Sequence, residues 1–346
     1  MSIRNMHRFM ILITALITCV LAINIPKTSA ESPIILGYYT SDSHNSLAAF
    51  HSYVNQISTD TFNTDVNGNI IGTIPTADVS FANSVNILPY ALVSNYGANG
   101  WDSQVSHQVL TNTKTKKRLI SNMVSLVKTN HYRGINIDFE AVLPGDRTAM
   151  SNFVRDVAIQ MKANGFLTMV SVPTKTVDDP TDEWSGAFDY EKLGTYADYI
   201  QVMTYDEHGV WGEPGSVASK PWIKSSLQFA RTMIPSEKIV MGIPAYGNDW
   251  NLSDPTNDSN QLIEWKDIPQ LIADTKATPK RDRTSGSMYF NYTASDGSNH
   301  VVWYEDVTSI KQKTHFTHTY GLAGVSVYAL GMEDGRFWEA ISAGLQ

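Results

Sequence analysis

The sequence contains a single cysteine among 346 residues, and this residue, Cys19, lies in an apolar segment near the amino terminus. The rest of the chain is therefore neither a disulfide-linked scaffold nor an enzyme with a thiol nucleophile. Internal repeats and low-complexity tracts are absent as well. Folding must depend on a hydrophobic core of ordinary size, which a chain of this length can bury.

The first 30 residues have the order of charge and hydrophobicity that is typical of a secretory signal peptide. Two arginines precede an apolar run from Phe9 to Ile23, and Pro26 and the small residue Ala30 follow. An uncleaved membrane anchor is disfavoured because the run is shorter than the ~20 residues of a spanning helix. Lipidation at Cys19 is disfavoured because the run continues past it. We predict cleavage after about Ala30 and a secreted chain, residues 31–346, without stable membrane insertion.

Basic residues are scarce in the predicted mature chain. Residues 31–346 contain 23 lysines and arginines against 34 aspartates and glutamates, because three of the 26 basic residues lie in the predicted signal peptide. The resulting net charge of −11 repels phosphate backbones and anionic surfaces, so we expect no nucleic-acid partner. A neutral polymer is unaffected by this charge.

Short apolar runs alternate with longer stretches of helical spacing, such as residues 112–129 and 146–164, and this order is typical of βα units around a parallel sheet. The eight predicted strands are Ile34–Tyr39, Gln56–Thr61, Asn86–Val93, Gly134–Glu140, Leu167–Val172, Tyr199–Thr204, Ile239–Ala245 and Ala323–Ala329. We predict one α/β domain, a (β/α)₈ TIM barrel with its chemistry at the carboxyl ends of the strands. The interval before the last strand is too long for one βα unit, and its hairpin pattern predicts a small α+β insertion at about residues 248–303.

The predicted fourth strand carries two carboxylates in an otherwise apolar run, RGINIDFEAV. Side chains alternate along a strand, so Asn136, Asp138 and Glu140 share one face. Like charges this close raise each other's pKa, and one carboxyl group then keeps a proton near neutral pH, as a general acid requires. The pair is therefore our candidate catalytic site.

Four tryptophans follow four different predicted strands in polar loops: Trp101, Trp184, Trp211 and Trp250. Any one of them could simply pin its loop to the protein. Four of them at the carboxyl ends of barrel strands favour a second interpretation, an extended glycan cleft, because the C–H faces of sugars stack on aromatic rings.

Three segments resemble glycoside hydrolase family 18, the chitinase-like barrel enzymes. Its DxxDxDxE pattern corresponds to residues 133–140, its MxYD pattern to Met203-Thr204-Tyr205-Asp206, and its GxPxYG pattern to residues 242–247. Residues 184–209 and 215–222 are similar, more closely, to the catalytic domains of bacterial spore-cortex and cell-wall N-acetylglucosaminidases. No LysM module is visible. The resemblance implies a secreted or cell-wall-associated glycosidase of this family.

The resemblance also implies a retaining, substrate-assisted mechanism in which the sugar's own acetamido group is the nucleophile. Glu140 would be the acid and base, Asp138 would orient the acetamido group and stabilise the intermediate, and Tyr205 would hydrogen-bond that group. The implied substrate-binding residues are Asn136, Met203, Asp206, Tyr246, Tyr328 and Trp211. We expect no cofactor and no metal, a monomer, and as partner a polysaccharide or oligosaccharide containing N-acetylglucosamine.

The sequence departs from the family pattern at four places. Arg133 and Asn136 stand where the family has its first two aspartates, and we expect that a charge at Arg133 beneath the carboxylates could hold Glu140 ionised. Tyr328 replaces the usual tryptophan of the eighth strand, and residues 93–96 replace the SxGG motif of the third. A smaller ring still stacks on a sugar.

Two other classes of protein remain open. An inactive glycan-binding barrel is disfavoured because Glu140 is present. A metal-dependent hydrolase with Asp138 and Glu140 as ligands is disfavoured because only His208 lies near a predicted strand end, while His315 and His318 precede the last strand. The sequence leaves open whether the polymer is peptidoglycan, chitin or a soluble oligosaccharide, and whether cleavage is exo or endo.

Overall fold

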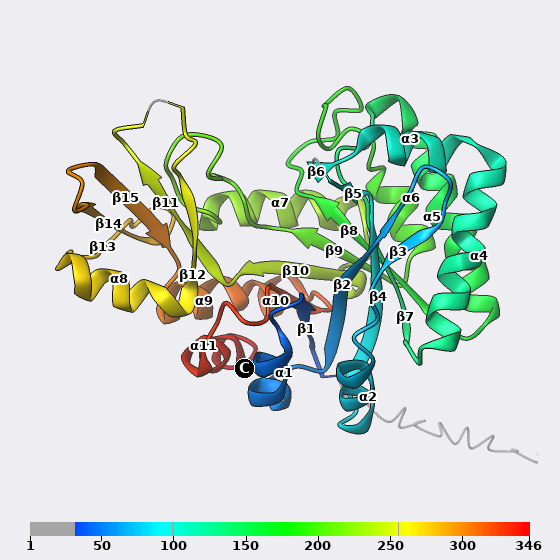
Figure 1. Cartoon of the computed structure of the whole chain (residues 1–346), viewed down its shortest axis with the longest axis horizontal. Coiled ribbons are helices and arrows are strands. Elements are labelled where there is room, and N and C mark those ends of the chain that lie inside the picture. The colour runs from blue at the N-terminus through cyan, green and yellow to red at the C-terminus, as the bar shows by residue number, and fades with distance from the viewer. Residues whose placement is uncertain (1–31, 99, 255) are drawn as a thin grey trace, which may run out of the picture. The chain divides into compact units, whose positions relative to one another are not determined.

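The structure is a computed structural model that describes residues 32–98, 100–254 and 256–346 (Figure 1). The predicted signal peptide and Cys19 lie outside these residues. In the part of the chain that is described, no helix combines the length and the hydrophobicity needed to cross a bilayer.

Eight parallel strands form a closed barrel. They are β1 (Ile34–Tyr39), β2 (Gln56–Thr64), β4 (Leu88–Ser94), β7 (Gly134–Asp138), β8 (Leu167–Pro173), β9 (Tyr199–Met203), β10 (Ile239–Pro244) and β16 (Gly324–Tyr328). Barrel strands that follow each other in the chain pair side by side. β1 pairs with both β2 and β16, the next and the last of them, which closes the sheet. The predicted fold class is confirmed, and every barrel strand overlaps a predicted one.

Helices follow the strands and cover the outside of the barrel (Figure 1). They are α1 (His44–Phe50), α2 (Thr76–Ser84), α3 (Ser103–Thr111), α4 (Thr113–Thr129), α5 (Arg147–Ala163), α6 (Tyr190–Tyr196), α7 (Lys220–Met233), α9 (Val307–Thr314), α10 (Phe316–Tyr320) and α11 (Gly335–Gly344). α4 begins where the Asn112 side chain accepts hydrogen bonds from two backbone N–H groups. Its fully buried residues Leu119, Met123 and Val127 recur every fourth position, so one face packs on the sheet.

The alternation of side chains along the strands divides the core into two layers. In β1, Tyr38 points into the barrel, whereas Tyr39 packs with the layer between strands and helices. In β7, Ile135 and Ile137 belong to this outer layer. Asn136 lies inside the barrel, where it contacts polar groups of other strands, and this is the face predicted for the two carboxylates.

The insertion between β10 and β16 is an antiparallel sheet with one helix. It consists of β11 (Tyr246–Asn251), β12 (Gln261–Glu264), α8 (Ile268–Thr275), β13 (Lys280–Arg281), β14 (Met288–Thr293) and β15 (Asn299–Tyr304). The strand order is β12-β11-β15-β14-β13. The hairpin of β14 and β15 turns at Gly297, whose φ of 91° favours glycine. Phe290 and Val302 bury one face of the sheet in the outer core layer. Smaller additions are β3 (Ile70–Gly72), antiparallel to β2, and the pair β5 (Tyr96–Gly97) and β6 (Gly100–Trp101).

Candidate active site

The two predicted catalytic carboxyl groups lie at the carboxyl end of β7. Asp138 is only 7% exposed, and its Oδ1 has no hydrogen-bond partner among the described residues. Asp60 of β2 is a third carboxyl group in this part of the barrel, close enough to act on both others electrostatically. Sequence reasoning missed Asp60, because its strand is far away in the chain and no motif marks it.

Burial and mutual repulsion raise the pKa values of these groups. Burial, followed by the charge of Asp60, raises the pKa of Asp138 to about 8. Burial and then the charges of Asp138, Asp206 and Asp60 raise the pKa of Glu140 well above its ordinary value. Burial also raises the pKa of Asp60 to about 6. None of the three takes part in an ion pair within the described part of the chain, so the site holds a carboxylic acid near neutral pH.

Asn136 lies beneath Asp138 and is fully buried. Its Nδ2 donates to Ser58 Oγ at 3.1 Å and to Tyr38 Oη at 3.5 Å, and its Oδ1 accepts from Ser171 Oγ at 3.3 Å. Ser171 and Tyr38 are joined in turn at 2.8 Å. Both the Nδ2 and the Oδ1 of Asn136 are thus engaged in hydrogen bonds within the barrel. This favours a role in supporting the strand that carries Asp138 rather than in contacting a ligand.

Tyrosines from three strands surround the carboxyl groups. The ring centroids of Tyr205 and Tyr328 are 6.1 Å apart, and those of Tyr205 and Tyr246 are 6.4 Å apart. Met203 packs against the same cluster. Burial raises the pKa of Tyr205 well above its ordinary value, so its hydroxyl group stays neutral and can donate a hydrogen bond.

Asp206 and Tyr246 form a hydrogen-bonded pair at the edge of this cluster. Tyr246 Oη donates to Asp206 Oδ1 at 2.6 Å, and Asp206 is accessible to solvent. The backbone of Asp206 has a φ of 64°, and Ala141, directly after Glu140, has a φ of 49°. Residues other than glycine rarely adopt this conformation, and such strain is concentrated at functional sites.

The glycines of the GxPxYG segment make room for this arrangement. A β-carbon at Gly242 would lie 2.6 Å from the Tyr205 ring, and one at Gly247 would lie 2.5 Å from the backbone oxygen of Trp303. A side chain at Gly242 would therefore displace Tyr205. The motif residues thus have a packing role that is visible only in the folded chain.

Asn95 fixes the backbone of Glu140 from the end of β4. Asn95 Nδ2 donates to the Glu140 carbonyl at 2.7 Å, and the Glu140 N–H donates to Asn95 Oδ1 at 2.9 Å. Nδ2 also donates to the carbonyl of Asp102 at 3.0 Å. Sequence reasoning noted residues 93–96 only as a departure from a motif. The one available signal was an asparagine placed directly after a buried strand.

The four predicted cleft tryptophans behave differently. Trp211 is 70% exposed and Trp184 is 48% exposed, as a stacking platform would be. Trp101 is partly buried and meets Tyr96 edge to face with centroids 5.1 Å apart. Trp250 is only 1% exposed, so the prediction that it lines an open cleft is wrong. Its indole N–H points out of the insertion to the backbone carbonyl groups of Gly209 and Gly212, in the loop between β9 and α7.

Arg133 does not act on Glu140, which corrects the expectation from sequence. It lies exposed at the amino end of β7, whereas Glu140 follows the carboxyl end of this strand, and no effect of Arg133 on the pKa of Glu140 is found. The eight-residue motif spans the full length of the strand, so its first and last positions lie at opposite ends of the barrel.

The histidines considered for a metal site lie apart from the carboxyl pair. His208 Nδ1 contacts the carbonyl of Glu213 at 3.2 Å, and His315 stacks on His318 with centroids 5.7 Å apart. Among the residues described, no three or more His, Cys, Asp and Glu side chains are arranged to hold a metal ion.

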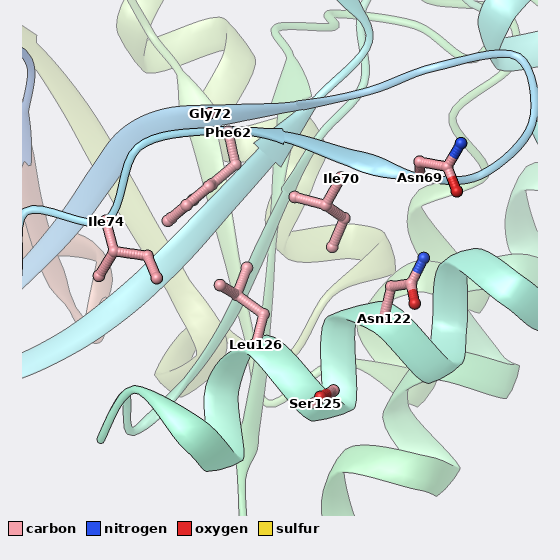
Figure 2. A pocket seen from close by; sticks show the side chains of 8 residues that line it. All are labelled: Phe62, Asn69, Ile70, Gly72, Ile74, Asn122, Ser125 and Leu126. Atoms are coloured by element: carbon pink, nitrogen blue, oxygen red, sulfur yellow. The ribbon is translucent and has the colours of Figure 1, made fainter.

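Two cavities lie outside the carboxyl cluster. One, of about 380 Å³, lies between the β2–β3 hairpin and α4 and is lined by Phe62, Asn69, Ile70, Gly72, Ile74, Asn122, Ser125 and Leu126 (Figure 2). It has no titratable side chain and therefore supports no acid–base chemistry. The other, of about 500 Å³, lies between α7 and α9 and is lined by three lysines together with Thr308, Gln312, His315 and Phe316.

An α/β barrel with two carboxyl groups of raised pKa at the carboxyl end of one strand, beside a cluster of tyrosines, is compatible with a glycosidase. The model of glycosyl hydrolases family 18 matches residues 97–333, and the chain belongs to this family. The recognition from sequence is confirmed, and the protein is a glycosidase.

Similar proteins agree with this assignment. The uncharacterized glycosylase YvbX of Bacillus subtilis (strain 168) is 45% identical over 344 residues, 98% of this chain and 99% of that protein. The cortical fragment-lytic enzyme of the same organism is 27% identical over 84% of this chain and 68% of the enzyme. The crystal structure of a chitinase from Chromobacterium violaceum has a TM-score of 0.86 at 36% identity, covering 90% of this chain and 99% of that one.

Proposed function

We propose that the protein cleaves β-1,4 bonds of N-acetylglucosamine-containing glycans by a retaining, substrate-assisted mechanism. The observation that carries this proposal is the pair Asp138 and Glu140 at the end of β7, where burial and neighbouring carboxylates raise the pKa of both groups, so that the pair holds a proton near neutral pH. One member can act as general acid while its neighbour balances positive charge. Substrate assistance needs no further carboxylate as nucleophile.

The first step breaks the glycosidic bond. Glu140 gives its proton to the glycosidic oxygen, the C1–O bond breaks, and the carbonyl oxygen of the 2-acetamido group bonds to C1. The product is a cyclic oxazolinium ion and a free sugar hydroxyl. Asp138 accepts a hydrogen bond from the acetamido N–H and, as a carboxylate, stabilises the positive charge. The neutral Tyr205 hydroxyl donates to the acetamido oxygen.

The second step restores the enzyme. Water adds its oxygen to C1, the bond from the acetamido oxygen to C1 breaks, and the Glu140 carboxylate takes the released proton. Two displacements at C1 leave the configuration retained. In this proposal Asp206 and Tyr246 bind sugar hydroxyls, and Met203 and Tyr328 line the floor of the site. Trp211 stacks on a more distant ring. The Tyr246–Asp206 hydrogen bond, the packing of Met203 and Tyr328 on the tyrosine cluster and the exposure of Trp211 support these roles.

The natural substrate is proposed to be peptidoglycan or chitin oligomers, met outside the cell or at the cell wall by a monomer. Support comes from the relatives, one of which is called a cortical fragment-lytic enzyme and one a chitinase. The signal-peptide pattern of residues 1–30 supports secretion, and the net charge of −11 for residues 31–346 is compatible with an uncharged glycan.

Mass spectrometry of products tests the proposal. Purified peptidoglycan and chitin hexamers are digested in parallel, and we expect products with N-acetylglucosamine at the cleaved bond. Proton NMR, recorded at once, should show the β anomer as the first product. A thiazoline analogue of the oxazolinium ion should inhibit, and glucosides with the same leaving group should not react. Equal rates on glucosides would contradict substrate assistance.

The alternatives are separated in the same assay. Dialysis against EDTA should leave turnover of a fluorogenic N-acetylglucosaminide unchanged, whereas a loss that Zn²⁺ or Mg²⁺ restores would favour a metal-dependent hydrolase. Binding of chitin hexamer without any turnover would favour a lectin-like barrel.

A further inference from the structure

The loop of residues 208–212, between β9 and α7, has few constraints of its own. It contains Gly209 and Gly212, and Gly215 follows, so its backbone has unusual conformational freedom. Its internal support is one turn, in which the Gly212 N–H donates to the Gly209 carbonyl at 3.1 Å. A loop of this composition would move freely unless neighbouring elements held it.

Side chains of the insertion hold this loop by its backbone carbonyl groups. Asn248 Nδ2 donates to the His208 carbonyl at 3.1 Å. The Nε1–H of Trp250 is shared between the carbonyls of Gly209 at 3.3 Å and Gly212 at 3.0 Å. Three carbonyl groups of a glycine-containing loop are thus held by side chains of one strand, β11.

A third donor comes from the segment before β12. Asn260 Nδ2 donates to the Val210 carbonyl at 2.8 Å, and its Oδ1 accepts the backbone N–H of Asn251 at 2.9 Å. Asn260 therefore ties the loop to the end of β11 through a single side chain.

Trp211 is the exposed aromatic residue of the loop that these contacts hold. A β-carbon at Gly209 would lie 2.3 Å from the Trp211 ring, so the indole packs against Gly209 where only a glycine leaves room. The carbonyl of the same glycine is held by Trp250, which is 1% exposed, while Trp211 is 70% exposed. One ring is a buried anchor, and the other is an open platform.

The platform lies away from the reaction centre. Tyr246, at the start of β11, bonds Asp206 beside the carboxyl pair. Asn248 and Trp250 share its face of the strand, two and four residues further on, which is roughly 7 and 13 Å along a strand. The loop that they hold therefore lies beyond the sugar at the cleaved bond.

We propose that Trp250, Asn248 and Asn260 are positioning residues that set the preference of the enzyme for long glycans. They hold residues 208–212 so that Trp211 is a preorganised stacking surface for a sugar outside the reaction centre. A fixed platform binds better because ordering of the loop is no longer required upon binding. The inference rests on the proposed function and adds to it the residues that determine which glycan length the enzyme prefers.

The test compares kcat/KM for chitin hexamer with kcat/KM for a fluorogenic diacetylchitobioside. Trp250→Phe keeps an aromatic ring but removes the indole N–H, and the hexamer preference should fall about three- to tenfold, the range of one net hydrogen bond. Asn260→Ala, at a partly exposed position, should act in the same direction without a risk to the core. Turnover of the short substrate should stay within about twofold, since the lost contact is outside the reaction centre.

Trp265→Phe is the matched control. Its buried indole N–H also donates to a backbone carbonyl of the insertion, that of Glu305 at 2.5 Å, but it does not contact the loop. This variant should lower the melting temperature and leave the hexamer preference unchanged. In a Trp211→Ala background, Trp250→Phe should cause no further loss, because the platform is already absent.

Two kinetic results would overturn the proposal. Trp250→Phe could behave as Trp265→Phe does, or its effect could persist in full in the Trp211→Ala background. If the wild-type protein cleaves neither substrate, the proposed function fails, and amide hydrogen exchange of residues 208–212 then decides on the positioning role. Faster exchange in Trp250→Phe supports the role, and unchanged exchange refutes it.

Discussion

Two groups of buried carboxyl residues in this protein differ in how their charge is compensated. Between the insertion and α9, Glu305 pairs with Lys313 at 2.5 Å and accepts from Ser287 Oγ at 2.6 Å. At the mouth of the barrel, Asp138 and Glu140 have no cation partner among the described residues, and Asp138 Oδ1 accepts no hydrogen bond.

The difference separates structure from function. A buried carboxylate with a cation stays charged and connects elements, whereas one without a cation keeps its proton at a cost in stability. Under the proposed function, the carboxyl pair at the barrel mouth supplies the catalytic proton, whereas Glu305, directly after β15, connects this strand to Lys313 of α9. Substitutions at the two places should have opposite effects on stability.

The largest effect is expected for Glu140→Gln. The amide keeps the shape of the side chain but cannot deliver a proton, so kcat should fall by about 10²–10⁴-fold. Melting temperature and affinity for chitin hexamer should be retained or increased, measured by calorimetry. Activity above about a tenth of wild type would mean that Glu140 is not the acid, since one general acid contributes far more than this.

Lys313→Met should give the largest loss of stability. It leaves Glu305 buried without its cation, and the free energy of unfolding should fall by about 3–5 kcal/mol, as for other broken buried ion pairs. Denaturant titration measures the loss. The double variant Lys313→Met/Glu305→Leu should recover much of it, whereas equal stability of the single and double variants would contradict the ion-pair account.

The pH dependence of the free energy of unfolding should reveal the raised pKa of Asp138. The pKa of Asp138 rises from 3.8 to about 8 on folding, so the folded state binds more protons than the unfolded state between these values. Stability should therefore fall as pH rises from about 4 to about 8, by at most about 1.4 kcal/mol per pH unit. Asp138→Asn should flatten the curve and raise stability at pH 8. A curve that stays as steep in the variant would assign the proton to another group.

The smallest effect is expected for Asp60→Asn. Asp60 is, after burial, the main cause of the raised pKa of Asp138, so its neutralisation should move the alkaline limb of kcat/KM to lower pH by less than about one unit. The exposed Glu191 of α6 provides the control, because Glu191→Gln removes the same charge from the outer surface. An unchanged limb in Asp60→Asn would remove Asp60 from the site.

Much of the fold follows from local signals. Apolar runs of strand length, helical spacing in α4 and α5 and the turn at Gly297 depend on near neighbours in the chain, and all of these elements are present where they were predicted. The shared face of Asn136 and Asp138 follows from alternation along one strand. The Asp138-Phe139-Glu140 pattern could therefore be identified as a candidate catalytic pair before any tertiary contact was known.

Contacts between distant segments decided the rest. Asp60 acts on Asp138 from another strand, Asn95 fixes Glu140 across 45 positions of sequence, and neither contact has a local signature. Trp211 and Trp250 look alike in the sequence, yet one is exposed and the other is buried. Alternation along a strand predicts which side chains share one face. Which residues of other strands or of the insertion contact that face is decided only when the barrel closes and the insertion packs on it.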